Sequence, residues 1–218
     1  MSNQLVPKEL TGGSLTNHSF NDVAASLAKG YLSRLQLFGS KSDACAEGKI
    51  GIGRWGIVRD DDITDLGEEL DAVIISWRPK ALQIAKEGII ANHDPSSDTY
   101  KNIKELSNVK DSGCMHGPEF LLWIPGQDQF VTYHMSSKTA RRESQKMEPL
   151  IGKAATFRCK LIDPPNSRHK WHGPVVVGCS TPLTVPPIED IEEQVKVFQN
   201  PPKQEVELAE DDDSGRER

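Results

Sequence analysis

The sequence predicts a mainly β fold, a β-barrel of short strands with short helices added to it. Three observations support this class. About seven segments are rich in β-branched and apolar residues, as strands are. Turn-rich links separate these segments, and the helical patterns between them are short. The 218 residues suffice for one domain with a sizeable core but are few for two.

The first third of the chain is predicted to hold one helix and two strands. Residues 21–30 ("NDVAASLAKG") begin with a capping asparagine and end with glycine, which favours a short helix. Residues 31–38 alternate between two faces, as a strand does. Residues 50–58 ("IGIGRWGIV") indicate a strand whose glycines mark bulges or close backbone approach. The following residues 59–71, with seven acidic side chains, are predicted to form an acidic loop.

The middle of the chain is predicted to hold a buried strand, a helix and a hairpin. Residues 71–79 ("DAVIISWRP") are apolar on both faces and are expected to end as a strand at the proline. A loop over residues 86–98 and a short helix over residues 98–107 follow. Residues 119–125 ("EFLLWIP") and 130–135 ("FVTYHM") flank the turn "GQDQ", which is typical of a β-hairpin.

Residues 135–147 ("MSSKTARRESQKM") predict an amphipathic helix of about three turns. Ser136 or Ser137 can cap its start, and Pro149 is expected to stop it because the residue before a proline avoids helical angles. At helical spacing, four cations share one arc and three small or apolar residues lie opposite. The cations are Lys138, Arg141, Arg142 and Lys146, and the residues opposite are Ala140, Ser144 and Met147.

Two strands and a helix complete the domain. Residues 153–162 alternate, so Ala155, Phe157, Cys159 and Leu161 are expected to face inward and Thr156, Arg158 and Lys160 outward. Residues 168–179 indicate a last strand interrupted at its proline, and residues 186–198 an amphipathic helix. A helix between two barrel strands is typical of oligonucleotide-binding (OB) barrels. We therefore predict an OB-like barrel with α+β additions.

The predicted organisation is one domain with polar ends. A single OB-like barrel domain with helical additions is expected over residues 21–198, between a disordered N-terminal arm (1–20) and a disordered acidic C-terminal tail (199–218). The tail has seven acidic and three basic side chains, whereas residues 129–172 have nine basic and three acidic ones. The net charge of −6 therefore hides a basic region inside an acidic protein.

The sequence favours a soluble, cytoplasmic protein. No run of about 18 apolar residues is present, so no membrane span is expected. The start lacks the basic and apolar segments of a secretory signal. The four cysteines are widely spaced without a C-x-x-C pair, and free thiols are expected.

Aromatic residues next to cations point to nucleic acid. Single-strand binders combine a cationic groove with aromatic side chains on which bases stack. The segments "GRWG", "SWRPK", "YHMSSKTARR" and "RHKWH" each have this pairing. The alternatives are core tryptophans, as expected for Trp123, and a merely solvated helix face. For Trp55 and Trp171, core and surface positions remain equally open. The candidate DNA-binding residues are Arg34, Arg54, Trp55, Trp77, Arg78, Tyr133, Lys138, Arg141, Arg142, Lys146, Arg158, Lys160, Lys170 and Trp171.

Metal binding and catalysis are the weaker alternatives. Cys159, His169, His172 and Cys179 could form a metal site, but only the two histidines have the spacing of paired zinc ligands. Cys114 and His116 lie in one glycine-rich loop, and neighbours in sequence rarely reach the geometry of a catalytic pair. We therefore expect no metal, no cofactor and no enzymatic activity.

The hairpin "PEFLLWIPGQDQFVTYHM", the helix "SSKTARRES", the strand "GKAATFRCKLI" and the ending "KWHGPVV…CSTPL" together resemble tailed-phage single-stranded DNA-binding proteins. The resemblance covers about residues 30–180 and the acidic tail. It implies an OB barrel and a non-enzymatic role, coating exposed strands in phage DNA replication or recombination in the host cytoplasm. It also implies that the tail contacts replication or recombination proteins, although this tail ends in "SGRER" and not in the aromatic residue common in that family.

The leading prediction is a protein that binds single-stranded DNA without sequence specificity. Aromatic side chains would stack on bases, and Lys and Arg would bind phosphates. The alternative is a phage structural or host-interaction module that does not bind nucleic acid. The oligomeric state and a preference for single-stranded DNA over duplex or RNA are left open by the sequence.

Overall fold

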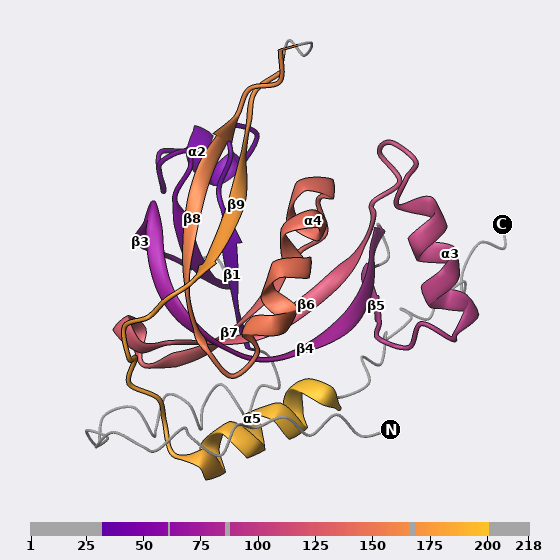
Figure 1. Ribbon diagram of the computed structural model, residues 1–218. Helices are drawn as coiled ribbons and strands as arrows, with labels where there is room; N and C mark the ends of the chain where they lie inside the picture. Colours follow the sequence, from indigo (N-terminus) through magenta and orange to yellow (C-terminus); the bar gives the residue numbers. More distant parts are fainter. Residues whose placement is uncertain (1–31, 61, 86–87, 166–168, 201–218) are drawn as a thin grey trace, which may run out of the picture.

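The computed structural model describes residues 32–60, 62–85, 88–165 and 169–200. These residues form one sheet and several short helices (Figure 1). The strands are β1 (Ser33–Leu37), β2 (Trp55–Arg59), β3 (Asp62–Gly67), β4 (Glu69–Ala85), β5 (Gly88–Asn92), β6 (Cys114–Ile124), β7 (Gln129–His134), β8 (Ala154–Ile162) and β9 (Trp171–Gly178). The helices are α2 (Asp43–Ala46), α3 (Asp98–Leu106), α4 (Lys138–Met147) and α5 (Ile188–Gln199), with 3-10 turns η1 (Pro125–Gln127) and η2 (Glu148–Leu150).

The nine strands lie in the order β3-β2-β1-β7-β6-β4-β8-β9, and β5 pairs with the far part of β4. All pairs are antiparallel except β1 with β7. The prediction of a mainly β fold with short helices is confirmed. The sheet bends strongly, but its two ends, β3 and β9, do not pair in the described residues, so a closed barrel is not established.

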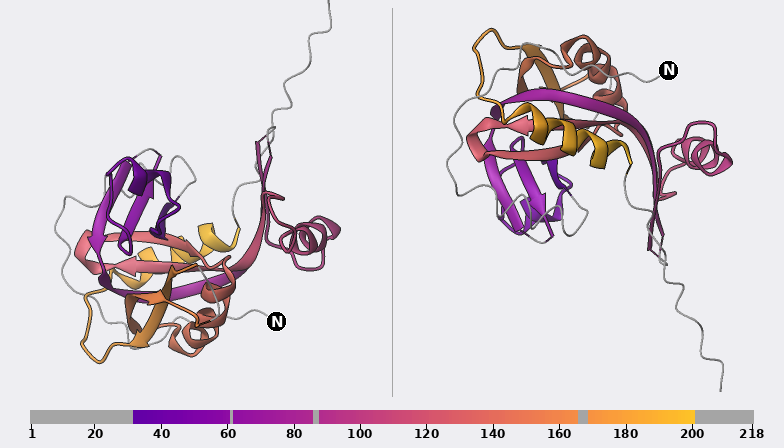
Figure 2. Two further views of the ribbon diagram at one scale, coloured as in Figure 1. Left: turned by 90° about the horizontal axis from the view of Figure 1, so that it is seen from above. Right: turned by 90° about the horizontal axis from the view of Figure 1, so that it is seen from below.

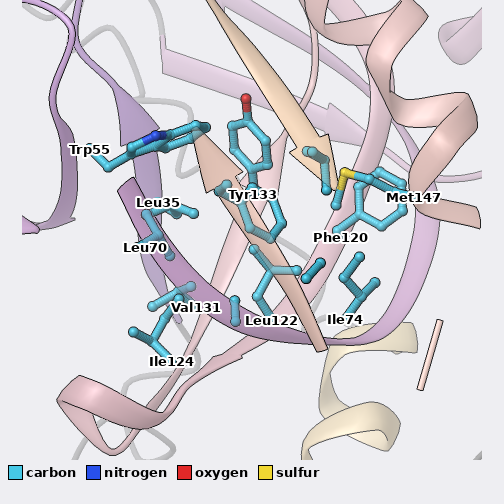
Figure 3. Close-up of a cluster of buried hydrophobic side chains, with 14 of the residues drawn as sticks. Leu35, Trp55, Leu70, Ile74, Phe120, Leu122, Ile124, Val131, Tyr133 and Met147 are labelled. Atoms are coloured by element: carbon cyan, nitrogen blue, oxygen red, sulfur yellow. The ribbon is translucent and has the colours of Figure 1, made fainter. Parts of the chain in front are cut away.

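The main core lies inside this bend. Trp55 of β2 meets Phe157 of β8 edge to face, with ring centroids 5.8 Å apart, so the two ends of the sheet touch across the interior. Tyr133 of β7 packs edge to face against both rings. Figure 3 shows Trp55 and Tyr133 above the aliphatic side chains of β1, β4, β6 and β7. Burial of this cluster supplies the apolar area that holds the bent sheet together.

The predicted hairpin is confirmed as β6 and β7. The two strands pair from Glu119 opposite His134 to Ile124 opposite Gln129. The 3-10 turn η1 reverses the chain, and Asp128 adopts the left-handed conformation at its end (φ 50°).

The strand predicted over residues 71–79 does not end at Pro79, because β4 continues through it to Ala85. Pro79 lies opposite Pro118 of β6. Two prolines can face each other only at a non-hydrogen-bonded position of an antiparallel pair, so neither missing N–H costs a ladder bond. The Pro79 carbonyl points away from β6 and accepts a hydrogen bond from His93 Nδ1 (3.0 Å).

Three other boundaries also differ from the prediction. The expected acidic loop forms the edge strand β3, in which Ile63 and Leu66 turn inward while the acids face solvent. The strand expected over residues 50–58 begins only at Trp55, after a turn with Gly53 at φ 80°. The loop expected over residues 86–98 contains β5, whose short run "GIIAN" has no alternation to reveal it.

An arm formed by β4, β5 and β6 extends from the body and carries α3 (Figure 2). The predicted helix over residues 98–107 is confirmed as α3, whose start is capped by the Ser97 hydroxyl. Tyr100 and Ile103 of α3 pack on Ala81 and Cys114 of the arm. This small cluster is separate from the main core.

Helix α5 covers the other face of the sheet, under β4, β6 and β7 (Figure 1). Ile191 and Phe198 of α5 pack on Val73, Leu121 and Trp123. The predicted amphipathic helix over residues 186–198 and the core position of Trp123 are therefore confirmed.

Strand β8 follows the predicted alternation only in part. Ala155 and Phe157 are buried as expected, but Leu161 is 49% exposed and Thr156 is buried. Strands β8 and β9 project beyond the core as a hairpin, which leaves Leu161 in solvent (Figure 1). The Thr156 hydroxyl donates to Asp71 (2.6 Å) on the adjacent β4, which explains its burial. Strand β9 also runs through Pro174 without interruption.

The predicted arm 1–20, the helix 21–30 and nearly all of the tail 199–218 lie outside the described residues. Their organisation stays a prediction. Among the described helices, none combines the length and apolar character needed to cross a membrane.

Candidate nucleic-acid interface

Trp171 at the start of β9 contacts the first turn of α4. Its indole is 40% exposed, and its Nε1–H donates to the Thr139 hydroxyl (3.1 Å). This hydrogen bond fixes one edge of the indole ring while the side chain keeps contact with solvent. The sequence left the position of Trp171 open, and the structure places it at the surface.

Three exposed cations lie on α4 and β8, the two elements next to this tryptophan. Lys138 precedes Thr139 in α4, and Arg142 lies one turn further along the helix. Lys160 of β8 lies opposite Gly173 of β9. Because Trp171 lies two residues before Gly173 on the same strand, the side chains of Lys160 and Trp171 point to the same face of the sheet. We call Lys138, Arg142, Lys160 and Trp171 the Trp171 surface. None of its three cations forms an ion pair with a described residue.

The sequence of α4 explains why the helix presents these cations. Ser137 caps its start by accepting a hydrogen bond from the Ala140 N–H (3.1 Å). Ala140 and Met147 are buried in the main core, as predicted. The opposite arc, with Lys138 and Arg142, therefore faces solvent. The predicted helix of about three turns is confirmed.

Glu143 attaches α4 to the outer edge of β9. Its side chain is almost buried, and its Oε1 accepts a hydrogen bond from the Val176 backbone N–H (2.8 Å). Lys146 Nζ pairs with the same carboxylate at 2.9 Å. Glu143 is not among the predicted site residues, and Lys146, predicted as one of four outward cations, is paired with it. Glu143 is the one acidic residue of α4 and lies one turn from the inward-facing Ala140 and Met147. This position in the sequence could have indicated that its side chain turns inward.

Arg141 is not available to phosphate in this structure. Its Nη1 donates to the His116 carbonyl (3.2 Å) and to the Ser136 carbonyl. The side chain is half-buried and joins α4 to β6. The prediction that all four cations of the helix point outward is therefore wrong for Arg141.

Three further candidate cations are held in exposed ion pairs. Arg54 pairs with Asp65 (2.7 Å), Arg158 with Glu69 (2.7 Å) and Lys170 with Asp163 (2.6 Å). Slight burial would raise the pKa of Asp65, but the Gly67 amide and the Arg54 guanidinium lower it overall. Exposed pairs contribute little stability, so these cations can exchange their partners for phosphate. Lys170 directly precedes Trp171, and Arg158 lies two residues before Lys160 on β8.

Trp55 and Tyr133 are not base-stacking residues. Trp55 is fully buried and Tyr133 is 5% exposed, with ring centroids 5.4 Å apart in the main core (Figure 3). Burial, with the nearby charge of Glu143, also raises the pKa of the Tyr133 phenol. In the sequence, Trp55 follows Arg54 and Tyr133 precedes Lys138 by five residues, which suggested a surface site for both rings. Each side chain instead points from its strand into the main core.

Arg78 belongs to a buried ionic cluster under the end of α5. Its Nη2 lies 2.6 Å from Glu119 Oε2, and Lys80 Nζ lies 2.5 Å from Glu119 Oε1. The Arg78 guanidinium also lies 4.2 Å from the centroid of the Phe198 ring and donates to the Phe198 carbonyl. Arg78 and Lys80 share the one Glu119 carboxylate in this conformation, and the DNA contact of Arg78 stays a prediction.

Two candidates lie apart from the Trp171 surface. Trp77 of β4 is 37% exposed and lies opposite Phe120 of β6. Arg34 of β1 is exposed and lies opposite Val58 of β2. Both lie on strands other than those that carry the Trp171 surface.

The residues considered for metal binding or catalysis do not assemble into a site. Within the described ranges, no three His, Cys, Asp or Glu side chains gather as metal ligands. Cys114 is buried under α3, and His116 Nδ1 is hydrogen-bonded to the Ser107 hydroxyl (2.6 Å). Burial raises the pKa of the Cys159 thiol, which disfavours the reactive thiolate.

A separate hollow of about 430 Å³ lies between β3, the start of β4 and η1. Asp65 and Asp71 line it together with Leu66, Leu70 and Ile124. Its charged lining is acidic, so it does not suit a phosphate group.

Comparisons with protein-family models, curated proteins and solved structures found no match to this chain.

Proposed function

We propose that this protein binds single-stranded DNA without sequence specificity and has no enzymatic activity. The observation that carries the proposal is an exposed tryptophan fixed beside three cations that have no acidic partner among the described residues. We further propose that the bent sheet is an OB-like barrel whose open side is covered by α4. The resemblance to tailed-phage proteins favours a role in DNA replication or recombination in the host cytoplasm.

The Trp171 surface suits a single strand for two physical reasons. An exposed aromatic ring can stack on an unpaired base, and such stacking contributes about 1–3 kcal/mol per base. Lys138, Arg142 and Lys160 are placed to bind the phosphates that flank such a base. Neither interaction reads a base edge, so the binding is expected to tolerate any sequence.

The acidic tail supplies a competing polyanion. Residues 199–218 have a charge of −4, and their acids can occupy the Trp171 surface when DNA is absent. We expect the tail to weaken binding and to contact replication or recombination proteins.

A salt titration tests the proposal. Fluorescently labelled single-stranded and duplex oligonucleotides are titrated with the full chain and with a chain that ends at residue 198. We expect tighter binding to the single strand, an affinity that falls as salt rises, and tighter binding without the tail. Binding that does not change with salt, or no binding at low salt, would contradict the proposal.

One observation favours the second candidate, a structural or host-interaction module. Ile84, Ile89, Leu106 and Val109 of the arm are each more than 40% exposed, as apolar residues at protein interfaces are. Reversing the charges of Lys138 and Arg142 distinguishes the two functions. The charge reversal should abolish oligonucleotide binding under the first function and leave any protein complex of the arm unchanged.

A further inference from the structure

Strand β5 presents an unpaired backbone edge. Ile84 of β4 donates its N–H to the Gly113 carbonyl, so its backbone groups point away from β5. Because Ile84 lies opposite Ile89, and Leu82 opposite Ala91, these two pairs are the non-hydrogen-bonded positions of the ladder. The N–H and C=O groups of Ile89 and Ala91 therefore point outward. They have no backbone partner among the described residues.

The side chains next to this edge are apolar and exposed. Ile84 and Ile89 form a cross-strand pair on one face of the arm, 51% and 49% exposed. Leu82 and Ala91 lie beside them on the same face. Helix α3 covers the opposite face, so it does not shield this pair.

The two strands at the ends of the sheet order, β3 and β9, are protected. Strand β3 carries Asp62 and Asp65, and charged side chains discourage edge pairing. The edge of β9 is covered by α4, where Glu143 accepts the Val176 N–H. Strand β5 combines outward-pointing backbone groups with exposed apolar side chains, and an edge of this kind favours pairing with another strand.

The chain leaves the described structure close to this edge. Gln199, the last residue of α5, donates its side-chain amide to the Ser76 hydroxyl (3.0 Å) and the Trp77 carbonyl (3.1 Å). Phe198 lies on Arg78. The tail therefore begins at the level of Arg78 on β4, where the arm leaves the body (Figure 1).

The sequence of the tail has the pattern of a strand. In "QEVELA" (204–209), Val206 and Leu208 alternate with glutamates, as in a strand with one apolar face. Pro201 and Pro202 precede it and favour an extended chain after α5. The exposed strip formed by Ile84, Ile89 and Ala91 offers apolar contacts that match these two side chains.

We propose that residues 204–209 add to the arm as a strand antiparallel to β5. Val206 then lies beside Ala91 and Leu208 beside Ile89, so their apolar face continues that of Ile84. The distance along β4 from Arg78 to Leu82 is about 13 Å. The added strand would lie two strand spacings, about 10 Å, to the side of β4. The six residues from 200 to 206 span about 20 Å when extended, which covers this path. A tail running outward along the arm is antiparallel to β5, because β5 runs inward.

This docking goes beyond DNA binding and does not depend on it. It fixes the tail to the arm through an interaction of neutral backbone groups and apolar side chains. Four acidic residues, Glu210 to Asp213, follow the docked segment directly. The docked strand therefore determines where the most acidic part of the tail lies.

Residue-resolved hydrogen exchange of the full chain, without DNA, tests the proposal. We expect the amides of Ile89 and Ala91 to exchange slowly in the native chain. In Val206→Asp/Leu208→Asp they should exchange at least about tenfold faster, because the added strand is lost. The matched control, Ser214→Asp/Gly215→Asp, adds the same charge outside the segment and should keep the native rates.

Equal rates in the native chain and in Val206→Asp/Leu208→Asp would overturn the proposal. Protection that increases with protein concentration would also overturn it, because a second copy would then occupy the edge. The oligonucleotide titration is independent of this result, so failure of the docking is distinguishable from failure of DNA binding.

Discussion

At the scale of single residues, Trp171 is the side chain on which DNA binding depends most. Trp171→Ala removes the stacking surface and is expected to weaken single-stranded DNA binding by about 1–3 kcal/mol. The free energy of unfolding should change little, because the ring is 40% exposed. Thr139→Val is the comparison variant: it removes the hydrogen bond that fixes one edge of the indole but keeps the ring itself, so binding should weaken less than in Trp171→Ala. Equal dissociation constants for Trp171→Ala and the native chain would contradict a stacking role.

The three unpaired cations should control the salt dependence. Each phosphate contact on a single strand contributes about −0.7 to the slope of log K against log salt. Replacing Lys138, Arg142 and Lys160 together with glutamine should therefore make the slope less steep by about 2. Lys101→Gln/Lys104→Gln on α3 removes cations elsewhere and should leave the slope unchanged. An unchanged slope in the triple variant would place the phosphate contacts on other residues.

His134 should make the fold sensitive to acid. Burial, with the nearby charge of Lys80, lowers the pKa of His134 to about 4. Unfolded histidine takes up its proton near pH 6.5, so stability is full above that pH and falls as the pH drops toward 4. The loss reaches up to about 3 kcal/mol. Glu119, whose pKa is lowered by Lys80 and Arg78 against its burial, acts in the same direction.

Urea unfolding at pH 7 and pH 4.5 measures this effect. The free energy of unfolding should fall between the two values, and His134→Gln should reduce the fall. A native chain that is equally stable at both pH values would show that His134 titrates normally.

At the scale of elements, Glu143 holds α4 against β9. Glu143→Ala leaves the Val176 N–H without its acceptor in a buried position, which costs about 1–3 kcal/mol of stability. Glu143→Gln keeps an acceptor oxygen and should be milder. Thermal or urea unfolding of both variants gives the comparison. If the alanine variant is no less stable than the glutamine variant, the hydrogen bond to β9 does not hold the helix.

Periodicity predicted the elements that have one clear apolar face. The β6–β7 hairpin, α3, α4 and α5 all appear where the pattern places them. It failed where tertiary pairing decides the outcome. The prolines at 79 and 174 lie at positions where β4 and β9 need no ladder bond, which depends on the partner strand. The acidic run forms β3 because Ile63 and Leu66 can pack beside β2.

The candidate site was predictable in part. The exposed cations of α4 follow from the helical arc, which depends on local spacing alone. The roles of Arg141 and Glu143 do not, because each bonds a backbone group far away in the sequence. Trp55 and Trp171 both lie beside polar residues, and only the bend of the sheet buries one and exposes the other.

At the scale of the whole molecule, opposite charges occupy different places. Acids line the edge strand β3 and the hollow beside it, whereas unpaired cations lie on α4 and β8, next to Trp171. The net charge of −6 would repel DNA if it were spread evenly. The separation allows an acidic protein to present one surface to a polyanion.

The most direct measurement is the affinity for a labelled single-stranded oligonucleotide, at one low salt concentration, of the native chain and of Lys138→Gln/Arg142→Gln/Lys160→Gln/Trp171→Ala. We expect the quadruple variant to fold, as judged by circular dichroism, and its affinity for the oligonucleotide to be at least about a hundredfold lower than that of the native chain. The control Lys101→Gln/Lys104→Gln should bind like the native chain. Equal binding by the native chain and the quadruple variant, or no binding by either, would contradict the account.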